Sequence, residues 1–297
     1  MTVSFCGLDL EHPVINGSGT FDVIAARRTF GDALDDAFPF SAFVSKTITL
    51  SPRAGNPPPR LWEAPSGLIN SIGLPNPGLQ VYMDRDLPEL SKLAVPLITN
   101  VMGSTIEEFV QLAEACQERE EIGAIELNVS CPNVKTGLDI GADPAALGRL
   151  VTAVRPITSK PVIVKLTPNC ADVVACAAAA ADAGADALSL INTLRAMALA
   201  PKTLQSTHFP TRPWLGGGTG GLSGAAVRAV ALAQVAAVAR SVGIPVVGMG
   251  GVQSARDARD LLDVGACLVA VGTESFRDPG AGSRIARGLR AMEGSYV

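Results

Sequence analysis

The sequence is poor in the residues that build metal centres and histidine-based catalytic triads. It contains only 2 His, His12 and His208, and no two of its 6 Cys have a C-x-x-C spacing. Structural zinc sites, iron–sulfur clusters and Ser-His-Asp triads depend on such groups. We therefore expect no metal site in this chain. The start of the chain carries no secretory signal pattern, so we interpret the cysteines as reduced thiols in a cytoplasmic protein.

Aromatic residues, strong net charge and long apolar runs are also scarce. Only 4% of the residues are aromatic although 47% are hydrophobic, and there are 30 Gly, so the core must consist mainly of closely packed aliphatic side chains. The 24 Lys+Arg and 28 Asp+Glu give a net charge of −4, which argues against nucleic acid or an anionic membrane as the main partner. The longest apolar run, residues 173–181, is much shorter than the roughly 20 residues that a membrane span needs.

What the sequence does contain is one unit that recurs along the chain. Short apolar runs alternate with stretches of helical spacing, such as residues 106–118, 225–241 and 257–263. The eight runs are residues 13–15, 42–44, 96–98, 124–127, 161–164, 187–191, 245–247 and 268–271. Continuous apolar runs of this length are typical of strands buried on both faces. The sequence therefore predicts the α/β class and a single (β/α)8 TIM barrel over residues 1–297, with an N-terminal hairpin and long rim loops at 51–77 and 193–224.

Polar groups or glycines follow every predicted strand. Barrels of this type carry their chemistry at the carboxyl ends of the strands. The groups are Asn16-Gly17-Ser18-Gly19, Ser45-Lys46-Thr47, Thr99-Asn100, Asn128, Lys165, Asn192-Thr193, Gly250-Gly251 and Gly272-Thr273. Lys46 and Lys165 are the strongest candidates for a functional role, because a surface lysine would more commonly lie on a helix face.

Glycine-rich segments after the last two strands predict a phosphate site. Gly250-Gly251 and Gly272-Thr273 stand where barrels commonly bind phosphate through backbone N–H groups, and residues 216–224 would add a further cradle with a hydroxyl group. Asn100 and Asn128 could satisfy a pyrimidine edge. A cation at Lys165 would stabilise an anionic reduced flavin at its N1–O2 edge. Flavin mononucleotide (FMN) combines these features.

One cysteine differs from the others in its context. Cys131 lies just beyond the fourth predicted strand, and Pro132 prevents the strand from continuing. We therefore expect its thiol on a rim loop, where it could act as a general base. Small apolar residues would serve equally well at the other five positions, so we interpret those cysteines as packing residues.

Five segments carry a resemblance to a known family. They are SKTITLSPRAGNPPPR at 45–60, GLINSIGLPN at 67–76, LNVSCPNVK at 127–135, INT at 191–193 and GGLSG at 220–224. Together they resemble class 1 dihydroorotate dehydrogenase, and most of all the catalytic subunit of its NAD-linked class 1B. The resemblance implies FMN-dependent oxidation of dihydroorotate to orotate in pyrimidine biosynthesis. It also implies that Cys131 removes the C5 proton while hydride passes from C6 to flavin N5.

The resemblance further implies a set of site residues and partners. Catalytic positions are Cys131 and Lys46. Substrate-binding positions are Lys46, Asn70, Ile72, Gly73, Leu74, Asn128, Asn133, Asn192 and Thr193. FMN positions are Ser18, Lys46, Thr47, Asn100, Asn128, Lys165, Ile191, Gly221, Ser223, Gly250, Gly251, Gly272 and Thr273. The expected partners are a second copy of the chain and a subunit that carries FAD and an iron–sulfur cluster.

Two segments depart from the family pattern, and other functions stay open. After Asn192-Thr193 the family usually has a Gly-Met segment and an Asp, but this chain has LRAMALA at 194–200. The loop at 136–141 lacks an aromatic residue that the family pattern leads us to expect. One alternative is a barrel like that of dihydropyrimidine dehydrogenase, in which a cysteine acts as an acid in reducing uracil or thymine. Another is a flavin-free aldolase with a Schiff base on Lys165, and a third is a non-catalytic FMN- or phosphate-binding barrel. Fumarate could also replace NAD as the final acceptor.

Overall fold

The computed structural model describes residues 2–129, 140–200 and 212–294. The strands are β1 Val3–Phe5, β2 Leu8–Leu10, β3 Val14–Asn16, β4 Phe43–Val44, β5 Leu61–Ala64, β6 Gly67–Asn70, β7 Leu97–Val101, β8 Ile122–Asn128, β9 Val162–Lys165, β10 Ala187–Leu190, β11 Leu194–Ala196, β12 Gly220–Ser223, β13 Val246–Met249 and β14 Leu268–Val271. The α-helices are α1 Val23–Phe30, α2 Ala33–Asp36, α3 Leu79–Val81, α4 Leu87–Leu90, α5 Ile106–Gln117, α6 Pro144–Val154, α7 Val173–Asp182, α8 Arg228–Ala239, α9 Ala255–Asp263, α10 Glu274–Arg277 and α11 Ala281–Gly294. Short 3-10 or π turns stand at Tyr82–Asp86, Ile140–Ala142, Arg155–Ile157 and Ala225–Val227.

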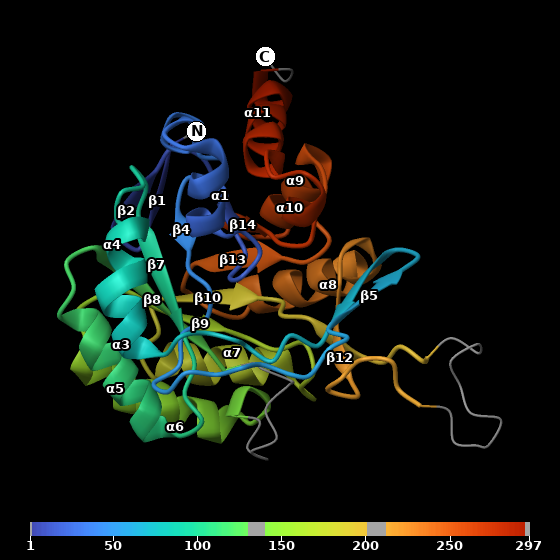
Figure 1. Ribbon diagram of the computed structural model, residues 1–297. Helices are drawn as coiled ribbons and strands as arrows, with labels where there is room; N and C mark the ends of the chain where they lie inside the picture. The colour runs from blue at the N-terminus through green and yellow to red at the C-terminus, as the bar shows by residue number, and fades with distance from the viewer. Residues whose placement is uncertain (1, 130–139, 201–211, 295–297) are drawn as a thin grey trace.

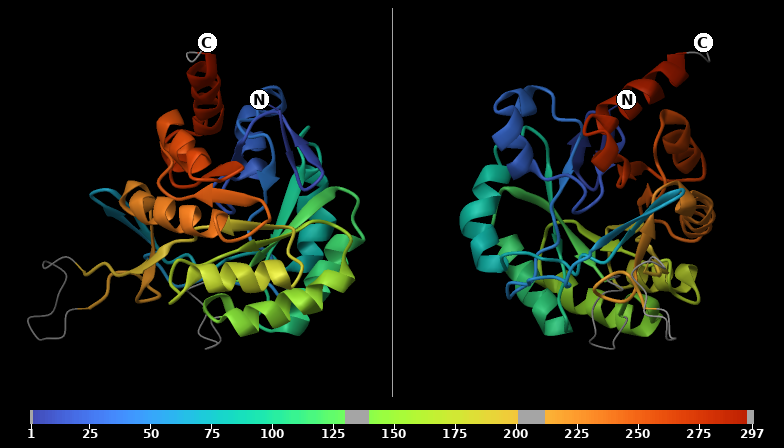
Figure 2. Two further views of the ribbon diagram at one scale, coloured as in Figure 1. Left: turned by 180° about the vertical axis from the view of Figure 1, so that it is seen from behind. Right: turned by 45° about the vertical axis from the view of Figure 1, so that its right-hand side comes forward.

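Eight parallel strands form the central sheet, as the sequence predicts. Their order is β3-β14-β13-β10-β9-β8-β7-β4, so that from β4 to β14 each barrel strand pairs with the next one along the chain, and β14 pairs with β3. Each of the eight predicted apolar runs contributes one of these strands. Helices lie outside the sheet, and in the right-hand view of Figure 2 the colours follow one another in order around it. This is the predicted (β/α)8 barrel.

The Asn16 side chain joins the first and second barrel strands. Asn16 is fully buried, its Oδ1 accepts from Val44 N at 2.8 Å, and its Nδ2 donates to Val44 O at 2.8 Å. On the other side of β4, the backbone pairs with β7 through Phe43 and Ser45. The amide of Asn16 thus supplies both hydrogen bonds that a neighbouring backbone would otherwise offer to Val44, and it closes the barrel at this seam.

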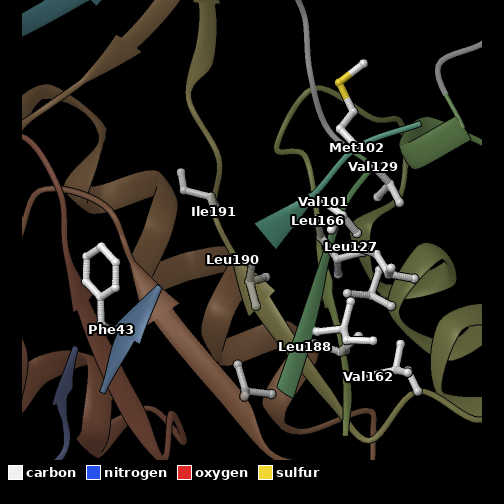
Figure 3. Close-up of a cluster of buried hydrophobic side chains, with 14 of the residues drawn as sticks. Phe43, Val101, Met102, Leu127, Val129, Val162, Leu166, Leu188, Leu190 and Ile191 are labelled. Carbon is white, nitrogen blue, oxygen red and sulfur yellow. The ribbon is translucent and has the colours of Figure 1, made fainter. Parts of the chain in front are cut away.

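Two apolar layers surround the strands. The outer layer packs strand side chains against the helices, and Figure 3 shows Leu127, Leu188 and Leu190 within it. The inner layer fills the barrel with small and medium side chains such as Ile98 and Ala124. The hairpin β1–β2 contributes Phe5 and Leu10 to this inner layer, which confirms the predicted N-terminal hairpin and gives it a packing role.

The two predicted rim loops meet in a second sheet. The antiparallel order β11-β12-β6-β5 brings residues 61–70 beside residues 194–223. Trp62 and Trp214 meet edge to face, with ring centroids 5.9 Å apart. In Figure 1, β5 and β12 project from the barrel on the side toward which the arrows of β10 and β13 point. This rim sheet therefore stands at the carboxyl end of the barrel.

The first glycines of the run 216–224, where the sequence predicts a further phosphate cradle, lie in close contact with the rest of the rim. A Cβ on Gly216 would lie 1.9 Å from Pro57 O, and one on Gly217 would lie 2.4 Å from Ser71 Oγ, so these glycines allow close packing within the rim. Only the end of the run approaches the loops after β13 and β14. There Ser223 Oγ accepts from Thr273 Oγ1 at 2.8 Å.

The helix starts follow local capping chemistry. Thr105 caps α5, and Asp143 caps α6 with Pro144 in its first turn. The helix expected at 257–263 begins earlier, at Ala255, because Ser254 and Asp257 form a capping box. None of the helices in the described part of the chain is both long and apolar enough to cross a membrane.

Candidate functional site

Polar side chains form a layer above the apolar filling of the barrel. Side chains alternate along a strand, so the position two residues beyond an inward-facing residue also faces inward. Ile98, Ala124, Ile163 and Ala187 all belong to the inner apolar cluster. Two residues further along the same strands stand Asn100, Glu126, Lys165 and Ser189, and Asn128 follows at the end of β8. We call these five residues the upper polar layer.

The upper polar layer is hydrogen-bonded around Glu126. Glu126 is 4% exposed, and its Oε2 accepts from Asn100 Nδ2 at 2.5 Å while its Oε1 accepts from Ser189 Oγ at 2.7 Å. Asn100 lies on β7, which pairs with β8, and Ser189 lies on β10, which is separated from β8 by β9. The carboxylate therefore ties three barrel strands together beneath the carboxyl end.

The side-chain oxygen of Asn100 has no hydrogen-bond partner among the described residues. Its backbone N donates to Ser45 Oγ at 3.0 Å and its Nδ2 is occupied by Glu126. Its Oδ1 is buried and accepts no hydrogen bond from the described residues. A buried carbonyl oxygen without a donor costs free energy, so this oxygen is available to accept a hydrogen bond from a bound molecule.

The two candidate lysines lie in different surroundings. Lys165 is 6% exposed and stands in register with Asn128 on one side and Ser189 on the other. Within the described residues it forms no ion pair. Lys46 follows β4 and is exposed. One buried and one accessible cation therefore occur at the same end of the barrel.

A short chain of hydroxyl and amide groups links β3, β4 and β8. Ser18 Oγ donates to Ser45 O at 2.7 Å and lies 3.4 Å from Thr47 Oγ1. Thr47 Oγ1 in turn accepts from Asn128 Nδ2 at 3.2 Å. Three positions that the sequence assigns to FMN, namely Ser18, Thr47 and Asn128, are thus brought together.

The loop after β13, one of the two predicted phosphate loops, contains two glycines with left-handed backbone conformations. Gly250 and Gly251 have φ values of 127° and 74°, which L-residues rarely adopt. A Cβ on Gly251 would lie 2.6 Å from Arg228 Cβ, so a side chain there would displace the start of α8. The Gly272–Thr273 turn leads directly into α10, and Thr273 joins Ser223 through its hydroxyl.

The predicted substrate-binding positions lie along the rim sheet and its approach. Asn70 Nδ2 donates to Gly221 O at 3.3 Å, and a Cβ on Gly221 would lie 1.9 Å from Thr193 Oγ1. Asn192 Oδ1 accepts from Thr193 N at 2.7 Å. Gly73 and Leu74 both have positive φ, at 75° and 54°, which turns the chain between Ile72 and the buried Asn76. Ile191 follows β10, and its N donates to Met249 O.

Cys131, Asn133 and His208 lie outside the described residues. The other five cysteines are free thiols. Burial raises the pKa of Cys116 and of Cys176 to about 12, and burial with nearby Asp186 raises the pKa of Cys6 to about 11. These thiols stay protonated at neutral pH, consistent with the packing role that the sequence indicates. The described residues also contain no cluster of three His, Cys, Asp or Glu that could hold a metal.

Sequence reasoning missed Glu126 and Ser189. Glu126 stands inside the apolar run 124–127, which we treated only as a strand. The available signal was its spacing: a carboxylate two residues before Asn128 must share its inward face. Ser189 interrupts its own strand run in the same way.

Fold and geometry together define a (β/α)8-barrel protein with a candidate ligand site at the carboxyl ends of its strands. The family model described as dihydroorotate dehydrogenase matches residues 1–292 of this chain. The chain therefore belongs to the dihydroorotate dehydrogenase family.

Named relatives and a solved structure agree with this placement. The chain is 47% identical over 290 residues to "Dihydroorotate dehydrogenase B (NAD(+)), catalytic subunit" of Pelobacter propionicus, covering 97% of this chain and 92% of that protein. It is 45% identical over 288 residues to the protein of the same name from Citrifermentans bemidjiense, covering 97% and 91%. The structure of an Eimeria tenella dihydroorotate dehydrogenase in complex with ferulenol superposes with a TM-score of 0.79 at 22% identity, covering 99% of this chain and 85% of that one, and shares the fold.

Proposed function

We propose that this chain binds FMN and oxidises dihydroorotate to orotate in pyrimidine biosynthesis, as the catalytic subunit of a class 1B dihydroorotate dehydrogenase. The observation that carries the proposal is the upper polar layer. A buried lysine, a buried carbonyl oxygen without a donor and a buried amide at Asn128 stand together in a barrel of this family. These groups suit a heterocycle with carbonyl and N–H groups along one edge.

The residues present fit FMN on two independent grounds. Asn100 Oδ1 lacks a donor, and the pyrimidine part of an oxidised flavin has an N–H group to offer. On the phosphate side, Gly250 and Gly251 have backbone conformations that favour glycine, and the backbone of such turns can bind phosphate oxygens. When bound, FMN would supply the hydride acceptor for the substrate.

The chain's own residues would prepare the substrate for this transfer. We assign to Cys131 the removal of the C5 proton, with its thiolate as the base. Lys46 is exposed at the same end of the barrel and would pair with the carboxylate of dihydroorotate. Asn70, Asn128, Asn133 and Asn192, with Thr193, would satisfy the ring N–H and C=O groups. Lys165 would hold positive charge beside the flavin.

The electrons must then leave the barrel. The relatives from P. propionicus and C. bemidjiense are named as NAD(+)-linked catalytic subunits, which supports a second subunit as the electron acceptor. We propose that this second subunit carries FAD and an iron–sulfur cluster and passes the electrons to NAD, and that the catalytic chain forms a homodimer.

The test is an assay of the purified chain with FMN. We expect the protein to take up FMN, and dihydroorotate to bleach the bound flavin anaerobically while dihydrouracil does not. Bleaching by dihydrouracil alone would favour the dihydropyrimidine dehydrogenase type of chemistry. A protein that takes up no FMN would refute the proposal.

A further inference from the structure

Glu126 is a buried carboxylate to which neither the sequence nor the proposed reaction assigns a role. It is 4% exposed, and both of its oxygens accept hydrogen bonds from neutral groups, Asn100 Nδ2 and Ser189 Oγ. It forms no ion pair with the described residues. A buried charge is costly unless it is fully hydrogen-bonded, so an apolar residue would be the simpler choice for stability alone.

The carboxylate determines which way the Asn100 amide faces. An amide group has a donor side and an acceptor side of nearly equal size, and it can turn over without changing its shape. Both oxygens of Glu126 accept hydrogen bonds, and one of them accepts from Asn100, so the Asn100 amide turns its Nδ2 toward Glu126. Its Oδ1 then faces away from Glu126, and this is the buried oxygen that no described residue satisfies.

We propose that Glu126 is a positioning residue that fixes the amide of Asn100 with its oxygen toward the flavin, so that Asn100 Oδ1 accepts the flavin N3–H. This inference rests on the proposed binding of FMN. The oxidised isoalloxazine ring has one ring N–H, at N3, between two carbonyl groups. An amide turned the other way would set a donor against that N–H, and both hydrogen bonds would be lost.

A cycle of two substitutions tests this polarity. Asn100→Asp places a carboxylate against the Glu126 carboxylate, which removes the donor that Glu126 needs. Adding Glu126→Gln in the same chain restores a donor–acceptor pair with the direction reversed. The introduced glutamine amide then donates to the introduced aspartate, whose second oxygen again faces the flavin. The double variant has nearly the same atoms and the same net charge as the wild type.

The measurement is the Kd of each apoprotein for FMN, read from the quenching of flavin fluorescence. We expect Asn100→Asp to weaken FMN binding by roughly tenfold or more, because the repulsion between the two facing carboxyl groups moves the introduced side chain out of line with the flavin N3–H. The Glu126→Gln variant alone should lose severalfold, because a glutamine amide at this position no longer enforces one orientation of Asn100. The double variant should return to within about threefold of the wild type. Glu121→Gln, an exposed glutamate paired with Arg119, is the matched control and should change nothing.

A second readout does not depend on affinity. With 15N-labelled FMN, the N3–H proton should be protected from exchange in the wild type and in the double variant, and should exchange rapidly in Asn100→Asp. This comparison stands even if Asn100→Asp alone is too unstable to purify, because the wild type and the double variant remain.

The outcomes separate the inference from the proposed function. Losses in the double variant that equal or exceed the product of the single losses would show that Glu126 is merely structural, and would overturn the inference. Unchanged affinity in Asn100→Asp would overturn it as well. A wild-type apoprotein that binds no FMN would instead refute the proposed function itself.

Discussion

The closure of the barrel by Asn16 gives a stability prediction whose size follows from the structure. Asn16→Leu keeps the branching and approximate size of the side chain but removes both hydrogen-bonding groups. Val44 N and Val44 O then lose their partners at 2.8 Å in a site from which water is excluded. Each buried group left unsatisfied costs about 1–3 kcal/mol, so the two together should lower the free energy of unfolding by about 2–6 kcal/mol.

A matched substitution elsewhere isolates the effect of burial. Asn169 makes the same kind of double contact, because its Oδ1 accepts from Arg195 N at 2.8 Å and its Nδ2 donates to Thr193 O at 2.9 Å. Asn169 is only half-buried, so water can replace its amide. Asn169→Leu should therefore cost less than about 1 kcal/mol.

Urea unfolding of the apoprotein, followed by circular dichroism and by tryptophan fluorescence, measures both variants. The two probes must give the same transition for a free energy to be defined. Equal losses for Asn16→Leu and Asn169→Leu, or a loss below about 1 kcal/mol for Asn16→Leu, would refute the view that the side chain of Asn16 closes the barrel.

Three further predictions concern the phosphate loop, a buried histidine and the thiols. Gly251→Ala should weaken FMN binding by tenfold or more, because φ is 74° and the new Cβ would lie 2.6 Å from Arg228 Cβ. The control is Gly7→Ala, where φ is 81° but the space around the new Cβ is open. It should leave FMN binding unchanged in the same titration. Burial lowers the pKa of His12, so the stability that neutral His12 contributes is present above the unfolded pKa of about 6.5 and is lost as the pH falls below it. The melting temperature of His12→Gln should therefore drop less between pH 7.5 and 5.5 than that of the wild type. Equal drops in the two proteins would contradict this. Burial raises the pKa of Cys116 to about 12, so iodoacetamide at pH 8 should modify Cys131 long before Cys116. Peptide mapping by mass spectrometry measures the order of modification. The reverse order would argue against Cys131 as the base.

The barrel could be predicted because its signal is local. Each buried strand is a continuous apolar run, and the residues that end these runs must meet at one end of a barrel. The same logic brought Asn128 and Lys165 into register. The predicted strand at 96–98 ended before Asn100. In the structure β7 continues to Val101, because Ile48 pairs with Val101 and extends the strand.

The rim sheet and Glu126 could not be found in this way. Strands β6 and β12 are separated by about half of the chain, and their pairing depends on where the barrel delivers them rather than on their own composition. Glu126 is a charged residue type within an apolar run, and its hydrogen-bond partners come from two other strands. Its role could therefore not be predicted from its own strand alone. Pairing between distant strands and satisfaction of buried charge are properties of the folded chain.

Anaerobic stopped-flow reduction of the bound flavin by dihydroorotate tests the central claim most directly. The wild type should take up FMN and lose its flavin absorbance on mixing with dihydroorotate. Cys131→Ser should bind FMN equally well and reduce it on the order of 100-fold more slowly or worse, because a positioned base contributes about that factor. Reduction at the wild-type rate in Cys131→Ser, or no reduction by dihydroorotate in the FMN-loaded wild type, would contradict the assignment.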